Sequence, residues 1–293
     1  MILREPLLPP GWYPRDKSMI EEFLEPFAKG AGSPSLPGKA VCGCAAVAPH
    51  AGWYYSGYPA ALAVSSLDRE AETVAVIGGH LGGGMPVLVA EEDGVKTPLG
   101  VMRIDTELRE AFKKVWPTRP DRYEDNTVEV LLPMVKYFFP SSQLLWLRFP
   151  AEISSCDAGK ALAETARTLG RRIVVLASTD LTHYGRNYGF SPRGRGRPAL
   201  EWVKKENDAA FIAAVLEANP SRVLERAEND SSACSAGSVL GALGFAAAQG
   251  TINARLLDYR TSADAESSGS GSQAPVEVPD SFVGYTAISF VST

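Results

Sequence analysis

The 293-residue chain contains three histidines, and each of them follows a run of apolar residues. His50 comes after VCGCAAVAP, His80 after TVAVIGG, and His183 after RIVVLASTDLT. Apolar runs of this length predict buried strands, so each imidazole is expected just beyond the carboxyl end of a strand. In an open α/β sheet these strand ends meet at one edge, where ligands bind. We therefore predict that the three imidazoles converge on one site, against the alternative of three unrelated loop histidines.

A carboxylate lies three residues before the last of these histidines, in STDLTHYG. On a helical turn, Asp180 and His183 would share one face. Such a pair suits two metal ligands, or a carboxylate that orients a general base. The alternative is that Asp180 caps the start of a helix.

A cysteine, Cys234, directly precedes the small-residue run SAGSVLGALGFAAA, which has the composition of a helix. A thiol at a helix N-terminus is biased toward thiolate, the form that binds metals or attacks electrophiles. The alternative is a buried cysteine with a structural role. The chain has four cysteines, too few for a disulfide framework at this length, so reduced thiols are expected.

Composition excludes several classes of partner. The net charge is −5, and no basic block suggests nucleic acid or an anionic membrane surface. No apolar run is long enough to cross a bilayer, and MILREPLLPPGWYPRD lacks the basic start and apolar centre of a signal peptide. We expect a cytoplasmic protein with a small-molecule or protein partner. No P-loop, dinucleotide fingerprint, nucleophile elbow or H-E-x-x-H motif supplies another chemistry.

Strand-like and helix-like stretches alternate along the chain. The expected strands are Val41–Ala48, Thr73–Ile77, Gln143–Leu147, Arg172–Ala177, Ile252–Leu257 and Phe282–Val291. The expected helices are Tyr58–Leu67, Asp105–Val115, Val128–Phe138, Asp157–Leu169, Leu200–Glu217 and Ala236–Gln249. This alternation predicts one α/β domain over residues 1–293, with a mainly parallel or mixed central sheet and helices on both faces. The polar, low-complexity segment 262–281 predicts a flexible loop before the last strand.

Several short motifs occur in an order that is similar to that of a known family. They are REPLLPPGWYP, APHAGWYYSG, TPLG, EDNTVEVLLP, STDLTHYG, ACSAG, YRTS and FVGYTAISF. Together they resemble the Memo family, whose bacterial and archaeal members are often called AmmeMemoRadiSam system protein B. That family is similar in fold to class III extradiol dioxygenases, which cleave catechols at a non-haem iron. The resemblance implies an α/β sandwich whose site lies at the strand ends.

The resemblance also implies a set of site residues. His50, His80 and Cys234 would line a metal site, with Asp180 and His183 beside it. In an enzyme, His50 and His80 would bind non-haem iron, and Cys234 or Asp180 would complete the ligand set. His183, with Asp180, would move protons to and from the substrate. A thiolate is softer than the carboxylate ligand of extradiol enzymes, so copper or zinc is the alternative metal.

The substrate-binding residues are expected close to this site. Trp53, Tyr54 and Tyr55 would wall the pocket and stack on an aromatic ring. Where the family usually has Glu-His-Ser, this chain has Asp-Asn-Thr at residues 125–127. An amide, Asn126, therefore stands in place of a fourth cleft histidine, and we place it among the substrate-binding residues.

Two functions follow from this resemblance. The first is an extradiol dioxygenase-like oxidoreductase that acts on a small aromatic substrate. The second is a metal-carrying or ligand- or peptide-binding protein that uses the same cleft without turnover.

Overall fold

The computed structural model describes residues 1–30, 42–250, 253–264 and 278–291. The strands are β1 (Leu3–Arg4), β2 (Gly43–Ala48), β3 (Thr73–Gly78), β4 (Val87–Val89), β5 (Gly94–Thr97), β6 (Gly100–Arg103), β7 (Thr118–Pro120), β8 (Gln143–Arg148), β9 (Ile173–Ser178), β10 (His183–Gly185), β11 (Asn253–Thr261) and β12 (Ser281–Val291). The helices are α1 (Lys17–Ala28), α2 (Trp53–Ser65), α3 (Thr106–Val115), α4 (Asn126–Glu129), α5 (Leu132–Phe138), α6 (Ser154–Thr168), α7 (Arg197–Trp202), α8 (Asp208–Leu216), α9 (Pro220–Asp230) and α10 (Ala236–Ala248). A 3₁₀ turn, η1 (Arg186–Tyr188), and a π-helical turn, η2 (Val203–Asn207), complete them.

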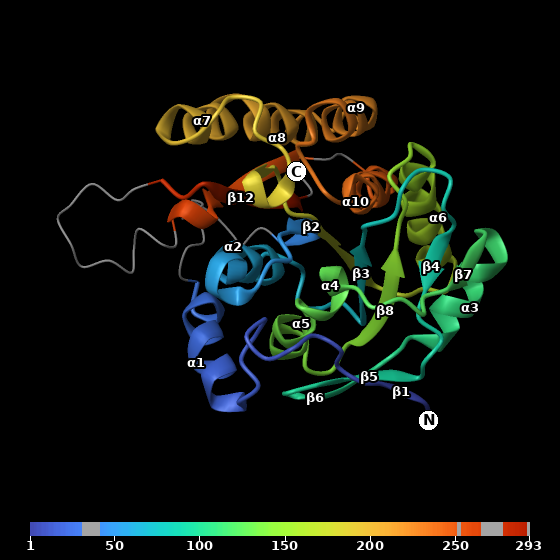
Figure 1. Ribbon diagram of the computed structural model, residues 1–293. Helices are drawn as coiled ribbons and strands as arrows, with labels where there is room; N and C mark the ends of the chain where they lie inside the picture. The colour runs from blue at the N-terminus through green and yellow to red at the C-terminus, as the bar shows by residue number, and fades with distance from the viewer. Residues whose placement is uncertain (31–41, 251–252, 265–277, 292–293) are drawn as a thin grey trace.

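A mixed sheet of nine strands forms the centre of the described part of the chain (Figure 1). The strand order is β10-β12-β2-β9-β3-β8-β4-β7, and β11 pairs with β12. The middle strands β2, β9, β3 and β8 are parallel, whereas β12 and β4 run antiparallel to their neighbours β2 and β8. A smaller sheet, β1-β5-β6, lies beside it. The predicted mixed α/β sheet is confirmed.

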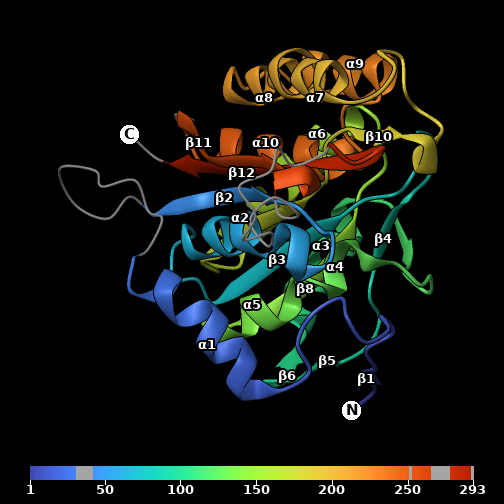
Figure 2. The ribbon, with the colours of Figure 1, turned by 60° about the vertical axis from the view of Figure 1, so that its left-hand side comes forward.

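Helices cover both faces of this sheet (Figures 1 and 2). Successive side chains of a strand point to opposite faces. Along β3, Val74 and Val76 pack with the layer that contains α1, α2 and α5, while Ala75 and Ile77 pack with α6, α8 and α10. The middle strands are therefore buried on both faces, which explains why they are apolar runs without alternation. No helix among the described residues has the length and apolar character needed to span a bilayer.

Three predicted helices differ from the observed ones. The first begins at Trp53 rather than at residue 58. The second is broken into α4 and α5, with Pro133 in the first turn of α5, where its missing N–H is tolerated. The third, over residues 200–217, consists of α7, the π-helical η2 and α8.

Two helices were not predicted, α1 and α9, although their caps are visible in the sequence. The Asp16 carboxylate accepts hydrogen bonds from Ser18 N and Met19 N at the start of α1. Asn219 caps α9, and Pro220 occupies its first turn. Most of the low-complexity segment predicted to be a flexible loop, residues 265–277, lies outside the described residues, as do residues 41 and 252 of two predicted strands.

The parallel strands β2, β9 and β3 are neighbours, and their carboxyl ends lie at one edge of the sheet. They end at Ala48, Ser178 and Gly78, just before His50, Asp180 and His80. The start of α10 reaches the same edge, because the loop before it forms a β-bridge between Ala233 and Leu181. The sheet thus brings four distant segments of the chain together.

Candidate metal centre

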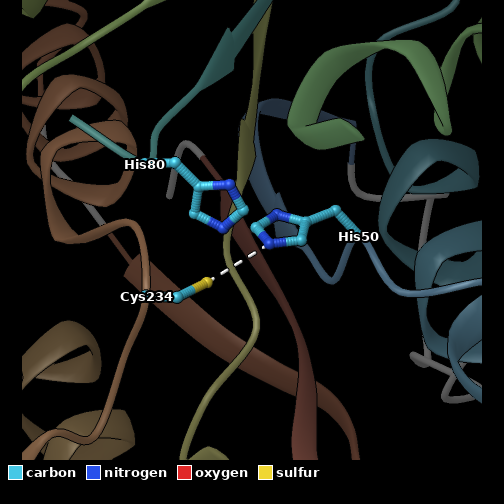
Figure 3. A group of neighbouring side chains, drawn as sticks. All are labelled: His50, His80 and Cys234. Carbon is cyan, nitrogen blue, oxygen red and sulfur yellow. Dashed lines mark hydrogen bonds between the residues drawn. The ribbon is translucent and has the colours of Figure 1, made fainter. Parts of the chain in front are cut away.

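Two imidazoles and a thiol meet at this edge of the sheet (Figure 3). His50, His80 and Cys234 each offer one ligand atom, and these atoms all lie within 4.8 Å of one another. Cys234 Sγ is 3.2 Å from His50 Nε2. The two imidazole rings are nearly perpendicular, with centroids 4.9 Å apart. Among the described residues, no other set of three His, Cys, Asp or Glu side chains has ligand atoms close enough to share one ion.

Hydrogen bonds fix both the backbone and the ring of His50. It is 2% exposed, and its backbone N–H donates to Oδ1 of Asp180 over 2.7 Å. Its Nδ1 is 2.8 Å from Ser178 Oγ, so Nε2 is the nitrogen that faces Cys234. The amide of Asn126 donates to the His50 carbonyl at 3.0 Å. Asn126 therefore positions a proposed ligand and also lines the cleft.

His80 has an unusual backbone. Its φ angle is +56°, in the left-handed region that residues with a Cβ rarely adopt. The chain reaches it through Gly79, where an added Cβ would stand 2.3 Å from the Cβ of Ser235. Only glycine at position 79 allows the chain just after β3 to lie so close to the segment before α10. The His80 ring then turns its Nδ1 to Oδ2 of Asp125, 3.0 Å away.

Cys234 is partly buried and is fixed through its backbone. Its N–H donates to the carbonyl of Asp180 at 3.2 Å. The next residue, Ser235, occupies the N-cap position of α10 and donates its N–H to Thr179 Oγ1 at 3.2 Å. The thiol therefore lies near the positive end of a 13-residue helix.

The three side chains shift one another's pKa. Burial alone would raise the pKa of the Cys234 thiol, but the imidazoles of His50 and His80 hold it well below its ordinary value. Burial acts to lower the pKa of His80, yet hydrogen bonds to Asp125 and Cys234 raise it to about 10. Burial also opposes the charge on His50, and Asp180 and Cys234 raise its pKa nevertheless. Each of these pKa shifts favours the charged form of its side chain over the neutral form.

The donor set fits a transition-metal ion. With metal–nitrogen and metal–sulfur bonds of about 2.1 and 2.3 Å, the separation of 3.2 Å between His50 Nε2 and Cys234 Sγ is short enough for one ion to bind both atoms. Two imidazoles and a thiolate suit iron, copper and zinc better than magnesium or calcium, which prefer oxygen ligands. The residues present therefore fit the metal that the sequence resemblance implies.

A cleft of about 460 Å³ opens over this group. His50, His80 and His183 all line it, so the predicted convergence of the three imidazoles is observed. Its aromatic walls come from four segments that are far apart in the sequence: Trp12, Tyr55, Tyr188 and Tyr285. The cleft is therefore a ligand-sized space lined by three imidazoles and four aromatic rings.

The predicted helical turn over Asp180 and His183 is wrong. Residues 179–182 are not helical, and His183 begins β10. The segment is kept extended because Leu181 N donates to Gly284 O and Thr182 N donates to the carboxylate of Asp208. His183 Nδ1 faces the carbonyl of Leu181 at 3.0 Å, and its ring meets Tyr188 rather than Asp180.

Two of the expected wall residues do not line the cleft. Trp53 is buried in the core, where its Nε1 donates to Val130 O, and Tyr54 is 68% exposed on the outside. The reason is that α2 begins at Trp53, and consecutive helical residues point about 100° apart. Of the three aromatics, only Tyr55 faces the cleft.

Four further residues contribute to the site without having been predicted. The carbonyl of Trp12 accepts a hydrogen bond from Trp53 N. In the sequence, Trp12 could have been noticed through the GWYP motif that contains it. Tyr285 lies in the FVGYTAISF motif, whereas Tyr188 lies in none of the motifs. Arg148 is the last residue of β8, in the stretch LLWLRFP. A charged residue at the end of an apolar strand indicates a site in the same way as the histidines that follow strands.

Several known proteins are similar to this chain over most of its length. A family model described as Memo-like protein matches residues 4–277. The chain is 30% identical over 304 residues to a MEMO1 family protein of Thermococcus onnurineus, with 99% of both chains covered. It is 31% identical over 303 residues to one of Pyrococcus abyssi, covering 98% of this chain and 99% of the relative. The crystal structure of an uncharacterized protein from Escherichia coli K12 matches with a TM-score of 0.46 and 13% identity, covering 85% of this chain and 99% of that chain. Because the family match runs over nearly the whole sequence, this protein belongs to the Memo family.

Proposed function

We propose that this protein binds one iron ion through His50, His80 and Cys234 and acts as an oxidoreductase on a small aromatic substrate. The observation that carries the proposal is the approach of the three ligand atoms within 4.8 Å, with His50 and His80 also lining an open cleft. Three ligands on one side of an ion leave positions for a substrate and for a second reactant. Bound iron would supply Lewis-acid and redox chemistry.

His183 is the proposed proton carrier. A carbonyl oxygen only accepts hydrogen bonds, so the contact with Leu181 O places a proton on Nδ1 of His183. Its Nε2 is then the nitrogen that takes or returns a proton in the cleft. The ring contact with Tyr188 at 5.0 Å limits how the imidazole turns.

The walls suit an aromatic ligand. Trp12, Tyr55, Tyr188 and Tyr285 line the cleft, and the three tyrosines carry hydroxyl groups that can form hydrogen bonds. A small phenolic or catecholic ring would pack against these side chains and place its oxygens toward His50 and His80.

A metal carrier without turnover is the second candidate, and Asn126 favours it. Its amide is engaged with the His50 carbonyl, so this position supplies no acid or base to the cleft. A thiolate ligand also binds copper or zinc well. In that case the cleft would hold metal or a ligand and release it unchanged.

Metal analysis of freshly purified protein, followed by anaerobic reconstitution with Fe(II), separates the two candidates. Oxygen uptake and a yellow ring-fission product on addition of catechols are expected for the oxidoreductase. Stoichiometric metal without oxygen uptake across a panel of catechols would support the carrier. Protein that retains no iron, copper or zinc would contradict both.

A further inference from the structure

Arg148 is a buried charge that the proposed reaction does not use. It is 3% exposed and does not line the cleft. Its guanidinium donates in three directions: Nε to Gly79 O at 2.9 Å, Nη2 to Asp125 Oδ2 at 3.1 Å, and Nη1 to Asp121 Oδ1 at 3.3 Å. A buried charge is costly unless it is fully paired, so this arrangement requires an explanation. Two of the three contacts lead directly to His80.

The first contact fixes the backbone of His80. A left-handed conformation costs a residue with a Cβ about 1 kcal/mol or more, and it persists only where the surroundings impose it. The peptide bond between Gly79 and His80 is held at both ends. Arg148 binds its oxygen, and Ser235 Oγ accepts from its N–H at 3.3 Å.

The second contact fixes the ring of His80 through Asp125. One oxygen of this carboxylate, Oδ1, accepts from Thr127 N at 2.8 Å and caps α4. The other, Oδ2, receives both His80 Nδ1 at 3.0 Å and Arg148 Nη2 at 3.1 Å. With Nδ1 turned to the carboxylate, Nε2 of His80 is the nitrogen left for a metal.

The third contact anchors the arginine itself. Asp121 Oδ2 accepts from Trp146 Nε1 at 2.8 Å, and Arg4 stacks over the Trp146 ring at 4.3 Å. Arg4 also donates to the Asp121 carbonyl at 3.0 Å. The guanidinium of Arg148 therefore has little freedom to move.

We propose that Arg148 is the positioning residue of this centre, which presets both the backbone and the ring of His80 for metal binding. The planar fork of arginine is needed, because a single ammonium group cannot donate to the Gly79 carbonyl and both carboxylates in these directions. The part concerning metal rests on the proposed function. The orientation of His80 in metal-free protein does not.

Histidine ring NMR tests the orientation directly, because the chain has three histidines. In metal-free wild type we expect a slowly exchanging, downfield Nδ1–H signal from His80, hydrogen-bonded to Asp125. In Arg148→Met this signal should disappear, while the ring signals of His183, whose ring contacts Tyr188 and not His80, keep their wild-type shifts. An unchanged His80 signal would overturn the proposal.

Arg109→Met is the matched control. Arg109 is also buried, and its Nη1 donates to the carbonyls of Ala90 and Glu92, away from the cleft. This variant should lose a similar amount of stability as Arg148→Met and leave the His80 signal intact. Loss of that signal in Arg109→Met would mean that it reports general destabilisation, and the assignment to Arg148 would fail.

Metal affinity is measured with Co(II), whose d–d and thiolate charge-transfer bands report the ligand geometry. Arg148→Met should bind Co(II) about 10- to 100-fold more weakly, with altered bands. Arg148→Lys keeps the charge and serves if the methionine variant does not fold. We expect it to restore stability without restoring the bands or the affinity. Wild-type behaviour of Arg148→Lys in both experiments would overturn the proposal. Wild type that binds no Co(II) would instead contradict the proposed function, while the NMR comparison still decides the role of Arg148.

Discussion

The carboxylate of Asp180 lies against His50 and not against His183. Its Oδ1 accepts from His50 N at 2.7 Å, and its Oδ2 is 4.0 Å from His50 Nε2. The carbonyl of the same residue accepts from Cys234 N at 3.2 Å. Asp180 therefore supports two proposed metal ligands, one with its side chain and one with its backbone.

Removing a proposed ligand and removing the proposed base should have different effects on metal content. We expect His50→Ala to abolish stoichiometric metal, because it removes an Nε2 donor. His183→Gln should retain metal and lose turnover, since its Nδ1 faces Leu181 O and not the other donors. Metal analysis and thermal unfolding check both variants. If the metal content of His183→Gln falls as far as that of His50→Ala, His183 is a ligand.

Cys234 should be the most reactive thiol in metal-free protein. The imidazoles of His50 and His80 offset its burial and keep its pKa low, whereas burial raises the pKa of Cys44 to about 11. At neutral pH, iodoacetamide should label Cys234 faster than Cys44 by roughly tenfold or more, and bound metal should slow this labelling. Peptide mass spectrometry measures both rates. Equal labelling of Cys234 with and without metal would remove it from the site.

Gly79→Ala should displace the segment before α10. An added Cβ would stand 2.3 Å from Ser235 Cβ, so we expect a loss of about 3 kcal/mol in the free energy of unfolding, together with loss of metal. Gly82→Ala is the control, because nothing lies within 4 Å of its added Cβ, and it should change stability by about 0.5 kcal/mol or less. Urea unfolding and metal stoichiometry check both. Wild-type metal binding by Gly79→Ala would contradict the geometry described.

How far the sequence predicts this site depends on whether each position has a local cause. His50 and His80 were placed correctly at strand ends because buried parallel strands are continuous apolar runs, and their loops open at one edge. Cys234 was singled out because it precedes a predicted helix, the family resemblance implied that it lines the metal site, and the structure brings it to 3.2 Å from His50. These residues could be predicted because they lie at the ends of strands and helices, which the pattern of apolar residues locates.

The parts that could not be predicted depend on tertiary pairing. Asp180 and His183 have the spacing of a helical turn. The segment is extended instead, because Thr182 N donates a hydrogen bond to the carboxylate of Asp208, which is distant in sequence. The directions of Trp53 and Tyr54 depended on the first residue of α2, and element ends are the least certain feature of a sequence. A single domain over residues 1–293 and the roles of the site residues stay predictions.

The buried carboxylate of Asp208 should make stability depend on pH. It accepts hydrogen bonds from Thr182 and Tyr259, but burial raises its pKa from 3.8 to about 6. The folded state thus binds this proton more tightly than the unfolded state. Asp208 therefore contributes stability below pH 4 that is lost as the pH rises through about 6, by about 3 kcal/mol.

Asp208→Asn tests this dependence. The difference in free energy of unfolding between wild type and variant should grow in favour of wild type as the pH is lowered from 7 to 4. Urea unfolding at four or five pH values measures it, and the other titrating groups cancel because both proteins contain them. Parallel curves would show that Asp208 does not titrate in this range.

Glu129, the last residue of α4, should hold the N-terminal arm, residues 5–16, against that helix. Its carboxylate accepts from Leu7 N at 2.8 Å, from Leu8 N at 3.0 Å and from the Tyr13 hydroxyl at 2.9 Å. Glu129→Gln would place an amide N–H₂ against these donors, so we expect a loss of about 2 kcal/mol and faster hydrogen exchange in the arm. The exposed Glu124→Gln is the control and should change neither. Unaltered exchange in Glu129→Gln would contradict this role.

The proposed ligands are widely spaced along the chain, and His50 and Cys234 are 184 residues apart. No fragment that ends before Cys234 contains all three, and no local segment contains two of them. On the proposed function, an unfolded chain would have no preformed chelate, and an ion would bind only after the strands have paired and α10 has docked. During synthesis, a metal could then enter only after most of the polypeptide has left the ribosome. Loading would be a step that follows folding, and it would stabilise the finished protein by mass action rather than guide the chain to its fold.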